Sequence, residues 1–445
     1  MVQHPIDVDA SSPFPIENVP FGIFSTNNNS KPRVGSIIGD YVIDVRLLSE
    51  HGAFNGTDKV ALPAIDSALS SCTLNLLAAL PYHVRSFIRD RIIQLLSDPS
   101  SALFTDSKLN SIALVHTNEV TMHLPVEPHS FTDFLCSETH LENGNRITGN
   151  SMPSFYSIPT AYNGRTTSII PSGECISRPK GMLKQSAPGE VPRYSFSTST
   201  RFDFELEIGV ILSGPIPRGQ IVTADQANEL IFGFVLLNDW SARDIQFAEM
   251  TGMGPYNGKA TATTISPWVV LPQALEEARC ELTSEKAQAL MSSQPTHLQH
   301  RVKDGMATWD VEVLASIANR SGTPSVVCKS NLRDLFWTPG QMFAHMASAG
   351  SGTFVGDIFG TGTISSPGHT AATPSLGCLF ELTDGGKTPW KLEDGREIVW
   401  LEDYDDVILT GWARGKGGKK IGFGEARGTL MPVEWSASEL DDAKI

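Results

Sequence analysis

The chain has 445 residues, 40% of them hydrophobic, which is enough for two or three domains with a substantial buried core. Its 34 Lys and Arg residues against 49 Asp and Glu give a formal net charge of −15. This balance argues against binding to nucleic-acid phosphates or anionic membranes, both of which need a basic face, and suits a small-molecule or cation partner.

The six cysteines are scattered along the chain with no C-x-x-C pair. Such spacing is typical of neither a disulfide framework nor a zinc site, so we expect reduced thiols in a reducing compartment. The N-terminal run MVQHPIDVDASSPFP lacks the basic and apolar regions of a signal peptide. No apolar run approaches the roughly 18 residues of a membrane span. We therefore expect a cytoplasmic protein.

The first part of the chain combines hairpin-like runs with helical periodicity. Residues 15–47 alternate apolar runs with turn residues, as in FGIFS, NNNSKPRVG and SIIGDYVIDV, which is typical of β-hairpins. In residues 81–97 apolar residues recur every four positions, which predicts an amphipathic helix. Two prolines in residues 121–133 mark a crossing into a larger domain. We expect domains at 1–125 and 126–445.

Beyond residue 130 the sequence consists mainly of short β runs separated by Gly and Pro. The runs predicted as strands are TTSIIPSG, FELEIGVILSG, IFGFVLLND, TISPWVVL, DVEVLAS, GDIFGTGTIS, LGCLFELT, DDVILTGW and IGFGEARGTLMP. Few helices separate them, which indicates a mainly β (α+β) fold with antiparallel or mixed sheets. Residues 274–300 are polar and helix-prone, typical of a surface insertion, and the basic run GKGGKK at 415–420 fits a hairpin loop.

The run RFDFELEIGV places Asp203, Glu205 and Glu207 at alternating positions of a predicted strand. Period-2 alternation directs the three carboxylates to one face, where they repel one another. Two interpretations are open: a face exposed to water, or a shared divalent cation such as Mg²⁺ or Ca²⁺. Asp133, and Asp239 at the end of the apolar run IFGFVLLND, make the metal site competitive with the water-exposed face, although spacing alone does not bring the segments together.

Ordered motifs run from about residue 12 to about 433. They are FGIFSTNNNSKPRVGSIIGD, MHLP, SFTDF–H, YNGR, FELE, LLNDWSARDIQ, GK–TTISPW, SN–FWT, GTIS and GFGEARG. Together they resemble the fumarylacetoacetase family, the last hydrolases of tyrosine breakdown, and NDWSARDIQ followed by GK–TTISPW is the most specific part. The resemblance implies an N-terminal SH3-like barrel with helices, a C-terminal mixed β-roll, and a homodimer acting on a small dicarbonyl compound.

The resemblance also implies a set of site residues, position by position. The metal ligands, for Mg²⁺ or Ca²⁺, match Asp133, Glu205, Glu207 and Asp239, with Lys259 and Thr263 at a supporting cation position. His140 matches the general base, and Lys259 and Arg243 match groups that stabilise the departing carbanion. The positions that hold the substrate match Arg243, Gln246, Tyr162 and Thr363. Asp203 is not a ligand in the family, so for it we keep the water-exposed interpretation.

The chain departs from the family pattern at three positions. The Glu expected just before LGCLFEL, which orients the catalytic His, is replaced by Pro374, and no acid lies between Asp357 and Glu381. Two tyrosines expected to hold the substrate's carboxylate ends are replaced by Leu135 and Met250. The loss of two hydroxyls makes the pocket less polar and favours a larger, more hydrophobic substrate.

Three hypotheses for the function follow. The leading one is carbon–carbon bond hydrolysis of a β-diketone or acylpyruvate other than fumarylacetoacetate, for example a polyketide-derived one. The second is a lyase or isomerase, acting as a decarboxylase, tautomerase or dehydratase on a metal-bound enolate, because the acid that orients His140 is missing. The third is a non-catalytic ligand-binding protein, against which the retained acids count, since mutually repelling carboxylates are costly to keep.

Overall fold

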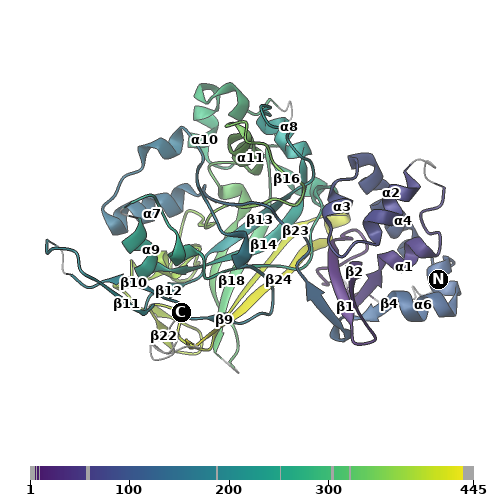
Figure 1. The fold of residues 1–445 in the computed structure, drawn as a ribbon, viewed down its shortest axis with the longest axis horizontal. Coiled ribbons are helices and arrows are strands. Elements are labelled where there is room, and N and C mark those ends of the chain that lie inside the picture. The colour runs from purple at the N-terminus through teal and green to yellow at the C-terminus, as the bar shows by residue number, and fades with distance from the viewer. Residues whose placement is uncertain are drawn as a thin grey trace, which may run out of the picture.

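The protein divides into an N-terminal part and a larger C-terminal part that lie side by side (Figure 1). The computed structural model describes residues 6, 8–9, 11–56, 61–186, 189–250, 252–301, 305–319 and 322–433. One hydrophobic cluster contains residues of both parts, among them Phe21 and Phe232. Phe21 and Val269 also exchange backbone hydrogen bonds of 3.0 and 2.8 Å. The two parts therefore share a core.

The N-terminal part contains a five-stranded sheet in the order β4-β3-β2-β1-β5. Its strands are β1 (Phe21–Thr26), β2 (Asn29–Ile38), β3 (Tyr41–Asp44), β4 (Leu114–His116) and β5 (Val120–His123). Its helices are α1 (Val45–Glu50), α2 (Leu62–Leu69), α3 (Asn75–Ala78), α4 (Tyr82–Ser97), α5 (Ala102–Thr105) and α6 (Ser107–Ala113). The antiparallel pairs β1–β2 and β2–β3 confirm the hairpins predicted for residues 15–47.

Helix α4 confirms the helix predicted over residues 81–97. Pro81 stands at its N-cap, and the four-residue period buries Val84, Ile88 and Ile92. The SH3-like barrel implied by the resemblance stays a prediction, because in the described residues β4 and β5 are not paired with each other.

The C-terminal part is built on two large sheets. The first has eight strands in the order β7-β6-β20-β13-β14-β15-β8, with β12 paired to β14. Its strands are β6 (Phe131–Leu135), β7 (Thr160–Asn163), β8 (Ile169–Pro171), β12 (Phe202–Asp203), β13 (Leu206–Leu212), β14 (Ile231–Ala242), β15 (Ala262–Ile265) and β20 (Ile358–Gly360). The second has five, β19 (Ser325–Asn331), β18 (Val311–Asn319), β23 (Asp405–Arg414), β24 (Lys420–Met431) and β9 (Ile176–Ser177), in that order.

The two sheets pack face to face through apolar side chains. A Cβ added to Gly411 of β23 would come within 2.9 Å of Leu236 Cδ2 on β14, so the sheets approach closely there. The longer helices around them are α7 (Glu138–Thr148), α8 (Ala224–Glu229), α9 (Arg243–Glu249), α10 (Glu285–Leu290) and α11 (Pro339–Ala347). Short two-stranded pairs complete the part: β10 (Lys180–Lys184) with β11 (Tyr194–Thr198), β16 (Arg279–Cys280) with β17 (Thr308–Trp309), and β21 (Trp390–Lys391) with β22 (Glu397–Ile398).

The run LGCLFELT is the one predicted strand that proves wrong, because it forms the short helix α12 (Leu379–Leu382) instead. A short apolar run fits a buried helix as well as a strand, so periodicity could not decide between them. The backbone N–H groups of Leu379 and Phe380 donate to the carboxylate of Asp203 rather than to a neighbouring strand. Tertiary contacts thus override the local pattern.

Two further predictions concern loops. The run GKGGKK connects β23 to β24, which confirms the hairpin loop. The segment 274–300 is helical in places, but Leu275, Ala287 and Leu298 are buried in the main core, so the prediction of a surface insertion was only partly right. All six cysteines are free thiols. None of the described helices is long and apolar enough to cross a membrane.

Candidate active site

Four buried carboxylates from neighbouring strands meet in the first sheet of the C-terminal part. Asp133 lies on β6, Glu205 just before β13, Glu207 on β13 and Asp239 on β14. One ligand oxygen from each lies within 4.8 Å of the others. The structure therefore brings together the segments that sequence spacing could not connect. We call these four residues the acid cluster.

Gly360 on β20 makes the approach of two of these acids possible. Strand β20 runs between β6 and β13, and Gly360 is in register with Asp133. A Cβ at this position would lie 2.5 Å from Glu207 Oε2 and 3.2 Å from Asp133 Oδ1. Only glycine leaves both carboxylates room on this side of the sheet.

The acid cluster has the properties of a cation site. Asp133 Oδ1 and Glu207 Oε1 are buried, and within the described residues neither accepts a hydrogen bond. Burial and the neighbouring carboxylates raise the pKa of both Asp133 and Glu207 well above the usual range. Unpaired buried carboxylate oxygens are costly, and a divalent cation with oxygen ligands would satisfy them. The donor set fits Mg²⁺ or Ca²⁺.

Lys259, Thr263 and Tyr162 surround the acid cluster. Lys259, at the end of the 3₁₀ turn Asn257–Lys259, lies with Nζ 2.5 Å from Glu205 Oε2 and 2.8 Å from Asp239 Oδ2. Burial would favour its neutral amine, yet the surrounding carboxylates raise the pKa of Lys259 and keep it charged. Thr263 Oγ1 and the Tyr162 hydroxyl donate to Asp239, at 3.2 and 2.9 Å.

His140 forms a dyad with a carboxylate. It lies in the first turn of α7, which Ser137 caps by accepting the backbone N–H of His140. His140 Nδ1 is 2.7 Å from Oε2 of Glu381, a buried residue of α12. Ser365 Oγ donates to the same oxygen at 2.6 Å and Asn143 Nδ2 to Oε1 at 3.0 Å. Burial acts to raise the pKa of Glu381, but these partners bring it below the usual value, so the carboxylate is ionised.

The prediction that Pro374 replaces the orienting acid was therefore wrong. It rested on a carboxylate preceding a strand at LGCLFEL, and that segment is a helix that carries the carboxylate within it. Glu381 was visible in the sequence as the only acid of this run. Its partner lies 241 positions earlier in the chain, so no local pattern joined the two.

The interpretation of Asp203 as water-exposed was also wrong. Asp203 is fully buried and accepts Arg243 Nε at 2.9 Å. Arg243 begins α9, and its Nη1 donates to Glu205 Oε1 at 2.7 Å and to Gln246 Oε1 at 3.1 Å. A buried arginine and backbone N–H groups thus partner the charge of Asp203. In Figure 1, α7, α9 and β12 lie on the side of the C-terminal part that faces away from the N-terminal part.

A pocket of about 200 Å³ opens beside the acid cluster. It is lined by Tyr162, Asn163, Gly164, Arg165, Pro255, Tyr256 and Lys259. Thr363 is buried, and its hydroxyl has no partner in the described residues. Leu135 and Met250 are not among the lining residues: Leu135 packs partly against the core, and Met250 is exposed. The substrate-binding roles of Thr363, Leu135 and Met250 stay predictions.

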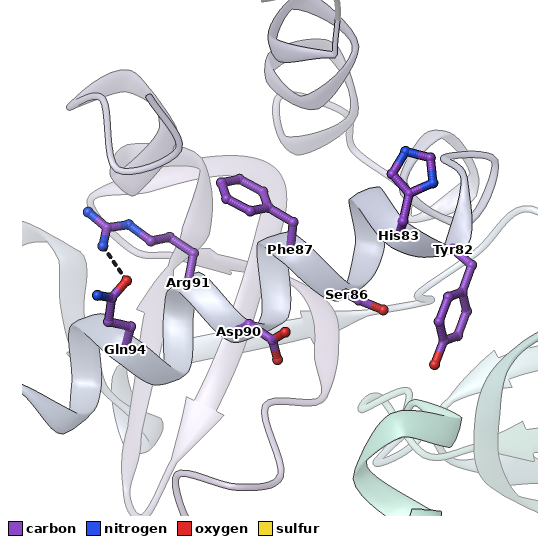
Figure 2. A pocket seen from close by; sticks show the side chains of 7 residues that line it. All are labelled: Tyr82, His83, Ser86, Phe87, Asp90, Arg91 and Gln94. Carbon is purple, nitrogen blue, oxygen red and sulfur yellow. Dashed lines mark hydrogen bonds between the residues drawn. The ribbon is translucent and has the colours of Figure 1, made fainter. Parts of the chain in front are cut away.

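A larger hollow of about 610 Å³ lies on the N-terminal part, away from these residues. Figure 2 shows that its lining side chains all project from α4: Tyr82, His83, Ser86, Phe87, Asp90, Arg91 and Gln94. Arg91 and Gln94 hydrogen-bond to each other at 2.5 Å. Because a single helix supplies the whole lining, the hollow is an open surface of α4 and not an enclosed site.

Known proteins resemble this chain both in sequence and in fold. A family model for the fumarylacetoacetase N-terminal domain matches residues 17–125, and one for the fumarylacetoacetate hydrolase C-terminal domain matches residues 129–429. A fumarylacetoacetase of Caenorhabditis elegans is 37% identical over 436 residues, 96% of this chain and 99% of that protein. The human fumarylacetoacetase is 33% identical over 433 residues, 96% of this chain and 98% of that protein.

Solved structures are similar in fold. A fumarylacetoacetate hydrolase from Exiguobacterium antarcticum superposes with a TM-score of 0.50 at 14% identity, covering 93% of this chain and 99% of that one. A putative HpcE protein from Mycobacterium smegmatis gives 0.50 at 18% identity, with 93% and 99% coverage. At these identities the likeness establishes the architecture alone: a mixed α/β chain with several sheets.

Proposed function

The chain belongs to the fumarylacetoacetase family, and from that premise we propose that it is a divalent-metal-dependent hydrolase of a β-diketone of the acylpyruvate type. The observation that carries the proposal is the combination of the His140–Glu381 dyad with the acid cluster, which hydrogen bonds through Asp203 and Arg243 connect. Burial acts to raise the pKa of Glu205, but the neighbouring cations Lys259 and Arg243 lower it below the usual range, so this carboxylate is ionised. A general base together with a cation site suits the hydrolysis of a chelating diketone.

The acid cluster would hold Mg²⁺ or Ca²⁺ through Asp133, Glu205, Glu207 and Asp239. When bound there, the cation would act as a Lewis acid that polarises the diketone oxygens. Tyr162, Thr263 and Lys259 orient Asp239 through their hydrogen bonds. Hydrogen bonds to ligating carboxylates of this kind support a site's geometry.

The dyad supplies the proton transfers. Since Nδ1 of His140 faces Glu381, Nε2 is the nitrogen left to accept a proton from water. Glu381 keeps the ring in this tautomer and stabilises the imidazolium that forms. The hydroxide adds to the carbonyl carbon, the adjacent carbon–carbon bond breaks, and its electron pair stays on the departing carbon. His140 returns the proton to that carbon, while Lys259 and Arg243 stabilise the transient negative charge.

The pocket beside the acid cluster supports an anionic substrate. Its lining includes the cations Arg165 and Lys259, and Arg165 lies 4.8 Å from the ring centroid of Tyr256. Among the described residues that line it there is no acid. The residues Leu135 and Met250, in place of the expected tyrosines, support a less polar tail than that of fumarylacetoacetate. We propose an acylpyruvate-type substrate with one carboxylate and an apolar end.

The lyase or isomerase hypothesis loses its basis, because it rested on the absence of an acid that orients His140, and Glu381 fills that role. We also propose the division into domains 1–125 and 126–445, supported by the two family models that meet there, and a homodimer, supported by the resemblance.

The test uses the purified full-length chain with Mg²⁺ or Ca²⁺, incubated with fumarylacetoacetate, a panel of acylpyruvates of increasing apolar length, and oxaloacetate. We expect metal-dependent release of pyruvate from the longer acylpyruvates, and an enzyme-coupled assay for pyruvate measures this release. Release of CO₂ without carbon–carbon hydrolysis, or no turnover of any compound, would contradict the proposal.

A further inference from the structure

Asp203 is a buried acid for which the proposed reaction has no direct use. It ends the short strand β12, where it is paired with Ser241 of β14. Both oxygens are fully engaged: Oδ1 accepts the backbone N–H groups of Phe204 and Leu379, and Oδ2 accepts that of Phe380 together with Arg243 Nε. Burying a charge costs free energy unless donors satisfy it, and the four donors of Asp203 fix the position of its carboxylate.

On one side Asp203 holds the start of α12. Its bonds to the N–H groups of Leu379 and Phe380 measure 2.8 and 3.0 Å. The side chain of Cys378, the N-cap of this helix, makes no capping bond of its own. The next residue after Phe380 is Glu381, the acid of the dyad. The two amides that Asp203 holds therefore fix the backbone from which the carboxylate of Glu381 projects toward His140.

On the other side Asp203 reaches the acid cluster through one side chain. Arg243 donates Nε to Asp203 Oδ2 at 2.9 Å and Nη1 to Glu205 Oε1 at 2.7 Å. The guanidinium plane is rigid, so these two bonds set the distance between the two carboxylates. All three side chains are buried, and low exposure keeps water from competing for the bonds.

We propose that Asp203 is a positioning residue that fixes the dyad acid Glu381 relative to the metal ligand Glu205, an inference that rests on the proposed function. In the proposed reaction the base activates the water that attacks a carbonyl carbon, and the cation would polarise the oxygen of that carbonyl, so the separation of base and cation site must be held closely. Asp203 contacts neither the substrate pocket nor His140; it acts through α12 and Arg243.

The test is a double-mutant cycle between Asp203→Asn and Glu381→Gln in the full-length chain with Mg²⁺. The change at position 203 keeps the size of the side chain, but the new NH₂ group replaces an oxygen that accepts two N–H donors. We expect kcat to fall about 10- to 100-fold, the range typical of supporting residues, and KM to change less than about threefold. In the Glu381→Gln background the same change should lower kcat by a clearly smaller factor than in wild type, because the part of its effect that passes through α12 and Glu381 is already lost.

Asp405 offers a matched control. It is buried, accepts the backbone N–H of Glu402 at 2.9 Å, and pairs with Arg396 at 2.7 Å, but it lies at the start of β23 in the second sheet. We expect Asp405→Asn to lower the Tm as Asp203→Asn does, with kcat within about threefold of wild type. Equal kcat losses in the two variants, or losses for Asp203 and Glu381 that multiply, would overturn the inference.

A second variant is available if Asp203→Asn does not fold, and an NMR measurement is available if no substrate is turned over. If Asp203→Asn does not fold, Asp203→Glu keeps the charge beside Arg243 and moves the carboxylate away from the amides of α12, and the same cycle applies. If no acylpyruvate is turned over, the proposed function fails, and the inference is judged by NMR. The His140 Nδ1–H resonance, shifted downfield by Glu381, should move upfield in the Asp203 variant and not in Asp405→Asn; an unchanged resonance would overturn the inference.

Discussion

At the scale of single residues, the chemistry of the site depends on how buried carboxylates are partnered. Glu381 is partnered by donors and by His140, and Asp203 by Arg243 and backbone amides. Asp133 and Glu207 each keep one buried oxygen without a partner in the described residues. The first two acids are thus satisfied within the protein, whereas the other two are set up for a cation.

The first prediction concerns the dyad. Glu381→Gln should keep the packing of α12 but place an uncharged amide against His140. We expect kcat to fall by about 10²- to 10⁴-fold, since an orienting acid that loses its charge no longer holds the correct tautomer. The Mg²⁺ concentration at half-maximal activity should stay within about threefold. Steady-state kinetics against Mg²⁺ checks both; a kcat loss under about threefold would contradict the assigned role.

The second prediction uses pH in the metal-free chain. Burial and neighbouring acids raise the pKa of Glu207 in the folded state. The folded state then holds its proton more tightly than the unfolded one, so the stability from this group is present at low pH and lost as pH rises. We expect the Tm of wild type to drop, relative to Glu207→Gln, between about pH 4 and pH 8. Differential scanning fluorimetry with EDTA checks this.

Added Mg²⁺ provides the control for the pH experiment. Saturating cation should raise the Tm of wild type at about pH 8, because ligand that binds only the folded state stabilises it. Glu207→Gln should lack most of this rise. A parallel course of both Tm curves with pH, or an equal response to Mg²⁺, would show that Glu207 is neither destabilised when ionised nor a ligand.

At the scale of elements, short segments govern the site. Strand β20 is only three residues long, yet it separates two of the acid-bearing strands, β6 and β13. Helix α12 has four residues and carries the dyad acid. The sequence predicted β20 as part of the strand-like run GDIFGTGTIS, but it could not assign α12, because a segment of four residues contains too little of an amphipathic pattern. Tertiary hydrogen bonds decide the conformation of α12.

The third prediction addresses β20. In Gly360→Ala the new Cβ would lie 2.5 Å from Glu207 Oε2 and push that carboxylate away from Asp133. We expect Mg²⁺ affinity to fall about 10- to 100-fold and the free energy of unfolding to drop by about 1–3 kcal/mol. Metal titration monitored by activity and urea denaturation give the two values.

Gly144 is the matched control, since a Cβ there meets nothing within 4 Å and the residue lies in helix α7, one turn after His140. Gly144→Ala should stabilise the helix by about 0.5–1 kcal/mol and leave Mg²⁺ affinity as in wild type. If both alanine variants behaved alike, the close contact of Gly360 with the acids would be irrelevant to metal binding.

At the scale of the whole molecule, the two parts are joined by a shared core and by backbone hydrogen bonds. The hydrophobic cluster around Phe21 and Phe232 continues from the N-terminal sheet into β14. The bonds between Phe21 and Val269 link β1 to the segment after β15. Interfaces this apolar do not separate readily, so the two parts should behave as one cooperative unit.

The fourth prediction follows from this joint core. The full-length chain should unfold in a single calorimetric transition, with the calorimetric and van't Hoff enthalpies in agreement. A chain that begins at residue 126 should expose Phe232 and lose the bonds at Val269, and we expect it to aggregate or to melt well below the full-length protein. Two separate transitions, or a stable isolated C-terminal part, would contradict a shared core.

The sequence by itself determined the family, most strands and the four acids of the cluster. Short segments of the sequence carry these features: hairpin turns, alternating apolar runs and the motif NDWSARDIQ can be recognised without knowing a distant partner. The acid cluster was predicted by residue type and resemblance, and the structure brings its members within 4.8 Å.

Only the tertiary structure decided the role of the remaining two acids. Glu381 meets His140 across 241 positions, and Asp203 meets Phe380 across 177. Both contacts depend on whether LGCLFELT is a strand or a helix, and its local pattern permits either. Packing settles it, because a buried carboxylate must find donors, and those of Asp203 are the amides that only the helix presents.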